Sequence, residues 1–111
     1  MEKEITAFIA YLHNVRNTSE NTEMSYRRDL NKVLKFMGSR GIHEVSAISS
    51  QDLNDYVAYL EENKFAAATV SRNIASLKAF YHFMVQKGYV QEDLSEQLKA
   101  PKIEKKVPEI M

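Results

Sequence analysis

The stretch that decides the fold is SENTEMSYRRDLNKVLKFMGSRG, residues 19–41. Its apolar residues recur at spacings of three and four, which predicts an amphipathic helix with one buried face. That face consists of Tyr26, Leu30, Val33, Leu34 and Met37. Ser19 is a suitable N-cap, because its hydroxyl can accept a hydrogen bond from a free amide of the first turn. Gly38 and Gly41 supply the stop, so we expect a helix over about residues 20–37.

The same periodicity extends on both sides of this stretch. It predicts helices over about residues 2–14, 50–62 and 67–87. Ser49 opens the second of these, with Asp52 three residues later, in the manner of a capping box. The last of these ends at Gly88, and its predicted buried stripe is Val70, Ile74, Leu77, Tyr81, Met84 and Val85. We expect an ordered loop over residues 42–48 and a weaker fifth helix over residues 92–98.

Composition favours one all-helical domain. The chain has 111 residues, three glycines and two prolines, which is too little turn-forming sequence for a sandwich or barrel. It has no cysteine, which excludes disulfides and thiolate metal sites. The N-terminus carries both signs of charge and leads into no long apolar run, so we expect neither a secretory signal nor a membrane span. The cytoplasm is the default location.

The net charge is zero, but its distribution is uneven. Residues 42–63 hold five acidic and no basic residues, whereas residues 64–91 hold four basic and no acidic residues. Such segregation would give a helical domain one acidic and one basic face, although surface charges also scatter this way by chance. A basic face would suit nucleic acid.

The residues indicate no reaction centre. His13, His43 and His82 lie in separate elements without metal-ligand spacing, and there is neither a glycine-rich phosphate loop nor a nucleophile elbow. We therefore predict no catalytic residue, no metal and no cofactor in this chain.

Two polar helix faces are more informative. The first carries Thr22, Ser25, Arg28, Lys32 and Lys35, with Arg27 alongside, and the second carries Thr69, Arg72, Asn73 and Ser76, flanked by Ser71 and Lys78. Hydroxyls and free amides can donate hydrogen bonds to phosphate oxygens, and arginine and lysine supply positive charge. Asparagine and arginine side chains could also reach base edges in a major groove. The plainer interpretation is that both are ordinary solvated helix faces.

Three segments resemble tyrosine recombinases of the XerC/XerD and phage-integrase kind. Residues 19–30 resemble the start of the family's second helix, with an S-x-N-T opening followed by Y-x-x-D-L. Residues 68–81 are similar to its fourth helix, T-x-x-R-x-x-x-x-L-R/K-x-F-Y. Residues 98–102, followed by Val107-Pro108, look like the family linker with its P-K pair. The three matches occur in order across nearly the whole chain.

The resemblance implies a SAM-like core-binding fold of four or five helices arranged as two crossed hairpins. Residues 1–100 would form the DNA-binding domain and residues 101–111 the start of a linker to an absent catalytic domain, so this chain would not itself be an enzyme. The second and fourth helices would face the major groove of double-stranded DNA. Candidate contacts are Thr22, Ser25, Arg27, Arg28, Thr69, Ser71, Arg72, Asn73, Lys78 and Lys102. Tyr26 is either core or contact. The chain alone would be monomeric, and its parent a tetramer on DNA.

Two departures and two alternatives remain. Ala66-Ala67-Ala68 precedes Thr69, where the family often has a serine or another capping residue, and Leu94 stands where many relatives have Asn-Pro. A helical protein–protein interaction domain would show an exposed apolar patch instead of a basic groove. A helix-turn-helix regulator needs a turn of three or four residues, and the loop between Gly38 and Ser49 is too long for one.

Overall fold

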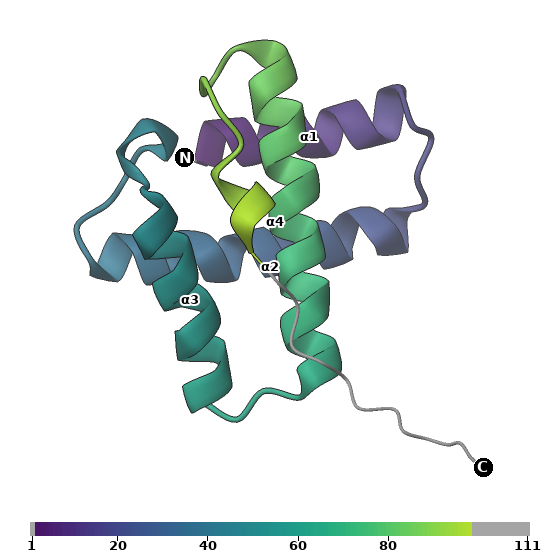
Figure 1. The fold of residues 1–111 in the computed structure, drawn as a ribbon. Helices are drawn as coiled ribbons and strands as arrows, with labels where there is room; N and C mark the ends of the chain where they lie inside the picture. The colour runs from purple at the N-terminus through teal and green to yellow at the C-terminus, as the bar shows by residue number, and fades with distance from the viewer. Residues whose placement is uncertain (1, 99–111) are drawn as a thin grey trace.

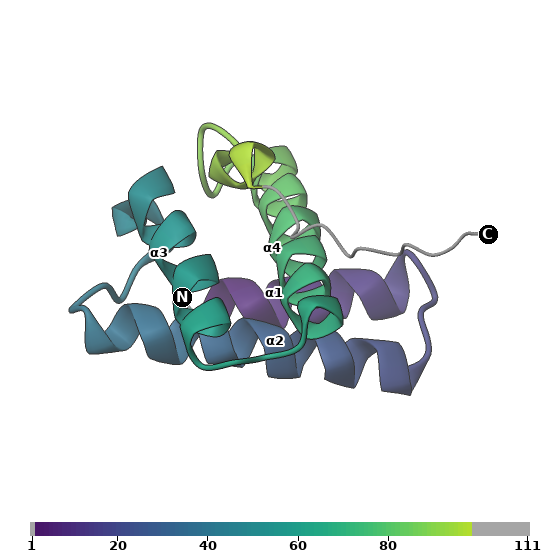
Figure 2. The ribbon, with the colours of Figure 1, turned by 60° about the horizontal axis from the view of Figure 1, so that its bottom comes forward.

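The computed structural model describes residues 2–98, and this part of the chain is all-helical. The four α-helices are α1 (Glu2–Asn14), α2 (Glu20–Ser39), α3 (Ser50–Glu62) and α4 (Ala67–Lys87), with short 3₁₀ helices η1 (Val45–Ala47) and η2 (Leu94–Gln97). The α1–α2 hairpin lies across the α3–α4 hairpin (Figures 1 and 2). The prediction of an all-α fold built from two crossed hairpins is confirmed.

The helix ends follow from local chemistry. Ser19 caps α2 by accepting a hydrogen bond from the Thr22 amide at 3.2 Å. At α3 the Ser49 hydroxyl accepts from the Asp52 amide at 3.2 Å, and Asp52 accepts from the Ser49 amide at 2.9 Å, which completes the predicted capping box. Gly88 ends α4 in the left-handed conformation with φ of 80°, where a side chain would be strained.

Aromatic packing joins the two hairpins. The Phe8 ring of α1 lies edge-on to Tyr26 of α2, with ring centroids 5.4 Å apart. The same ring packs against Phe80 and Phe83 of α4 at 5.6 and 5.4 Å. Because Phe8 touches both other helices, its burial fixes the crossing of the α1–α2 hairpin over α4. Tyr26 is partly buried, so it belongs to the core and also reaches the surface.

The structure differs from several sequence predictions, including that for Ser76, which was predicted on a polar face and is buried. Val85 is 36% exposed instead of buried, because it lies two turns after exposed Lys78 on the same side of α4. The fifth helix is only the 3₁₀ turn η2, which Asp93 caps by accepting from the Ser95 amide at 2.9 Å. The α2 helix continues past Met37 to Ser39. The loop over residues 42–48 is ordered, contains η1 and buries Val45 and Ile48.

Candidate nucleic-acid interface

An ion pair between a buried carboxylate and a half-exposed guanidinium lies where α2 and α4 cross. The Asp29 side chain of α2 is 1% exposed and accepts two hydrogen bonds from Arg72 of α4, from Nε at 3.1 Å and from Nη2 at 2.9 Å. The Ser76 hydroxyl donates a third at 2.9 Å. The hydrogen bond to Asp29, and then its charge, raise the pKa of Arg72. Three donors thus compensate a carboxylate that would be costly to bury alone.

A small hollow adjoins this pair. It has a volume of about 190 Å³ and is lined by Thr22, Ser25, Tyr26, Asp29, Arg72, Ala75 and Ser76. The crossing therefore brings together three of the predicted DNA contacts, Thr22, Ser25 and Arg72, from two helices. The Thr22 hydroxyl oxygen accepts a hydrogen bond from the Ser19 hydroxyl at 3.0 Å, which leaves its own hydrogen to donate elsewhere. Hydroxyls beside a guanidinium are suitable partners for a phosphate group.

Further cations line the outer side of α2. Arg28 is exposed and borders a shallow groove that is also lined by Asn31, Lys32, Leu34 and Lys35 of the same helix and by the acidic Glu2 of α1. The Lys32 ammonium also lies 4.5 Å from the centre of the Phe65 ring, so a cation–π contact orients it. Arg27 is exposed as well but lines neither this groove nor the hollow at the crossing.

The other predicted contacts on α4 differ in their surroundings. Lys78 is exposed, whereas Thr69 and Ser71 are partly buried. Asn73, which the polar pattern assigned to the surface, lies in the core at 0% exposure. Its Oδ1 accepts from the Tyr56 hydroxyl at 2.9 Å and its Nδ2 donates to the Thr69 carbonyl at 2.9 Å, so its side chain is not presented to solvent. Lys102 lies outside the described residues.

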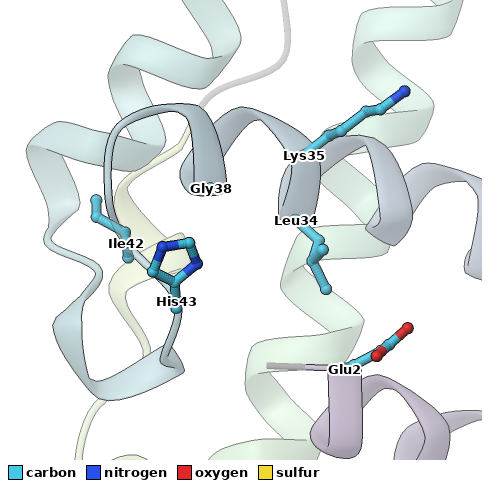
Figure 3. A pocket seen from close by; sticks show the side chains of 6 residues that line it. All are labelled: Glu2, Leu34, Lys35, Gly38, Ile42 and His43. Atoms are coloured by element: carbon cyan, nitrogen blue, oxygen red, sulfur yellow. The ribbon is translucent and has the colours of Figure 1, made fainter.

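Another hollow, at the end of the α1–α2 hairpin where α1 begins and α2 ends, contains none of the predicted DNA contacts. It is lined by Glu2, Leu34, Lys35, Gly38, Ile42 and His43, from the start of α1, the end of α2 and the loop after it (Figure 3). Figure 3 shows Lys35 extending away from Ile42 and His43.

Within residues 2–98, no His, Asp or Glu residues gather in threes that could hold a metal ion. In the same part of the chain, no helix combines the length and apolar character that crossing a membrane requires. Burial raises the pKa of Tyr56 and of Tyr81, so both hydroxyls stay protonated near neutral pH.

Sequence reasoning missed the role of Asp29. The residue falls on the buried stripe of α2, three positions after Tyr26 and one before Leu30. A carboxylate at such a position needs a partner, and that requirement was the available signal. The identity of the partner could not be deduced, because Arg72 is 43 residues away in the sequence.

The comparisons with known proteins agree with this architecture. The family model described as phage integrase, N-terminal SAM-like domain, matches residues 5–88. A tyrosine recombinase XerC from a Roseiflexus species is 32% identical over 108 residues, which is 97% of this chain and 34% of that protein. A putative tyrosine recombinase from Caldanaerobacter subterraneus is 38% identical over 107 residues, covering 96% of this chain and 37% of that protein.

A tyrosine recombinase XerC from Pseudomonas putida is 32% identical over 111 residues, which is 100% of this chain and 37% of that protein. The chain spans about a third of the length of the curated relatives it matches. No solved structure matches it significantly. The chain belongs to the family of phage integrase N-terminal, SAM-like domains.

Proposed function

We propose that this chain is a DNA-binding domain that clasps one side of duplex DNA during site-specific recombination or integration. The observation that carries the proposal is the meeting of Thr22, Ser25 and Arg72 at the crossing of α2 and α4. In this proposal residues 1–100 are the DNA-binding domain and residues 101–111 lead into a linker. A catalytic domain of the parent tyrosine recombinase cuts and rejoins the strands, in a tetramer on two DNA sites.

The placement of charge supports the proposal despite zero net charge. Arg28, Lys32 and Lys35 border the outer side of α2, and Lys78 is exposed on α4. The acidic helix α3 lies on the other side of α4 from the first turns of α2 (Figures 1 and 2). Arg40 also partly neutralises α3, since its Nη2 lies 2.8 Å from Asp55 and 3.5 Å from Asp52. Attraction of phosphates depends on such local potentials more than on the net charge.

An NMR titration tests the proposal. The ¹⁵N-labelled chain is titrated at low salt with a short duplex of generic sequence. We expect amides over residues 22–28 and 69–78 to shift together while those of α3 stay still. Scattered shifts, or none at high DNA concentration, would contradict DNA binding and favour the protein–protein interaction domain instead.

Two lysines of α4 provide a matched pair of variants. Lys78 and Lys87 are both exposed, but Lys78 lies six residues after Arg72, about 9 Å along the helix axis, whereas Lys87 lies fifteen residues after it, about 22 Å along the axis at the far end of α4. We expect Lys78→Gln to weaken DNA binding and to reduce its salt slope by about one, the value for one lost phosphate contact. Lys87→Gln removes a charge far from the proposed interface and should leave both the DNA affinity and the salt slope nearly unchanged. Equal effects of the two substitutions would remove Lys78 from the interface.

A further inference from the structure

We propose that Asp29 is a positioning residue for DNA recognition: it fixes the Arg72 guanidinium so that its remaining N–H groups face a backbone phosphate at the hollow between α2 and α4. The inference rests on the proposed DNA-binding function and assigns a role to a buried acidic residue that does not itself touch DNA. It predicts that removing a negative charge from this protein weakens its binding to a polyanion.

The geometry of the pair leaves Arg72 with donors to spare. A guanidinium has five N–H groups in one rigid plane, and Asp29 accepts from Nε and Nη2 only. The edge bonded to Asp29 is buried, since the Asp29 side chain is 1% exposed, whereas the Arg72 side chain is 48% exposed. The exposed N–H groups are therefore those that point away from the carboxylate. A planar fork held at two points has one orientation.

Asp29 is itself held in place. Ser76 is buried and donates to Oδ2, the same oxygen that accepts from Arg72 Nε. The carboxylate is therefore fixed by α4 on two sides while its own backbone belongs to α2. An unpaired arginine would lose side-chain entropy on meeting a phosphate, whereas Arg72 has already lost it on folding.

Charge and position make opposite predictions for Asp29. The Asp29→Asn variant is nearly isosteric but loses one negative charge, so the net charge rises from zero to +1. If Asp29 matters only through its charge, DNA binding becomes tighter. If Asp29 positions Arg72, binding becomes weaker, because an amide oxygen is a poorer acceptor and the second amide atom is a donor that cannot accept from Arg72.

The experiment measures DNA affinity by fluorescence anisotropy, with the whole chain and a labelled short duplex at low salt. We expect Asp29→Asn to bind about tenfold more weakly than the wild type, which is the effect of one lost charge-assisted hydrogen bond. Glu20→Gln is the control, because it removes an exposed acidic charge from the same helix and should leave binding unchanged or tighter. Equal or tighter binding by Asp29→Asn overturns the positioning role alone. A wild-type chain that binds no DNA overturns the proposed function as well.

A second variant and a spectroscopic measurement guard against a folding defect. Arg72→Lys keeps the charge but cannot form the two-pronged contact, and a thermal melt shows whether each variant is folded. We expect a folded Arg72→Lys chain to bind as weakly as Asp29→Asn. In the wild type, the Arg72 Nε–H signal should exchange slowly with solvent and shift on DNA addition while remaining protected. Loss of that protection on binding would show that DNA breaks the pair, and the positioning role would be wrong.

Discussion

The side chains of Tyr56 and Asn73 form a buried hydrogen-bonded chain between α3 and α4. The Tyr56 hydroxyl donates to Asn73 Oδ1, and Asn73 Nδ2 donates to the Thr69 carbonyl, each at 2.9 Å. Tyr56→Phe would leave the Asn73 oxygen buried without its donor. We expect this substitution to lower the free energy of unfolding by about 1–3 kcal/mol, as measured by urea denaturation.

The matched control for this prediction is Tyr59→Phe. Tyr59 lies three residues later on the same helix but is 37% exposed, so water can replace any partner of its hydroxyl. Its substitution should change stability by less than about 0.5 kcal/mol. A Tyr56→Phe variant as stable as Tyr59→Phe would mean that the buried hydrogen bond contributes nothing net.

These polar core residues mark the limit of what the sequence could predict at the residue scale. Hydrophobic periodicity identifies Leu30 and Leu77 as core, and the structure confirms both. The same method places Asn73 on the surface, because an asparagine on a helix usually points to solvent. Its burial depends on Tyr56, 17 residues earlier in the chain, and the Asp29–Arg72 pair is likewise a product of the helix crossing.

At the scale of elements, the start of α4 is a helix end without a side-chain cap. Its N-cap is Ala66, which has extended backbone angles but no side chain that can accept a hydrogen bond. The departure from the family pattern at this position is therefore reflected in the structure. We expect Ala66→Ser to raise the free energy of unfolding by about 0.5–2 kcal/mol, measured by urea denaturation. Ser49→Ala, which removes the cap of α3, should lower it by a similar amount, and an unchanged Ala66→Ser variant would show that this helix end frays regardless of its cap.

Substitution by alanine should change the stability of the protein in opposite directions at Gly88 and at Gly38. Gly88 has φ of 80°, so Gly88→Ala forces a side chain into the left-handed region and should destabilise the protein by about 1–2 kcal/mol. Gly38 lies inside α2, where a new Cβ would meet only the His43 ring at 3.9 Å. Gly38→Ala should therefore stabilise by about 0.5–1 kcal/mol. Thermal melts of both variants check the pair, and a shared direction of change would contradict the assigned backbone roles.

The long helices were predictable and the short ones were not. The bounds of α1 and α4 follow from periodicity and from stop signals such as Gly88, because an amphipathic helix of several turns repeats its pattern many times. The segment ending at Leu98 has too few turns to show a repeat. It forms the 3₁₀ helix η2 and buries Leu98, which depends on the space left between α3 and α4.

At the scale of the whole molecule, α4 holds the two hairpins together. It packs against α1, α2, α3 and η2, whereas α1 has no close packing with α3 within the described residues. The proposed DNA-contacting residues thus lie on the helix with the most neighbours and on the α2 helix that crosses it. Because this site is packed on several sides, we expect the proposed DNA contact to cost little conformational entropy.

The zero net charge of the chain limits the affinity for DNA that we expect of the proposed site. We expect the isolated chain to bind generic duplex with a Kd in the range of about 10⁻⁴–10⁻⁶ M at physiological salt, which is typical of nonspecific binding. Fluorescence anisotropy over a series of salt concentrations measures both the Kd and the number of phosphates contacted. In a longer parent protein, a tethered second domain would add its contacts at high effective concentration, so the clamp would be tight although each half is weak. Submicromolar binding by this chain alone would contradict that division, because one helical face would then suffice to hold the DNA.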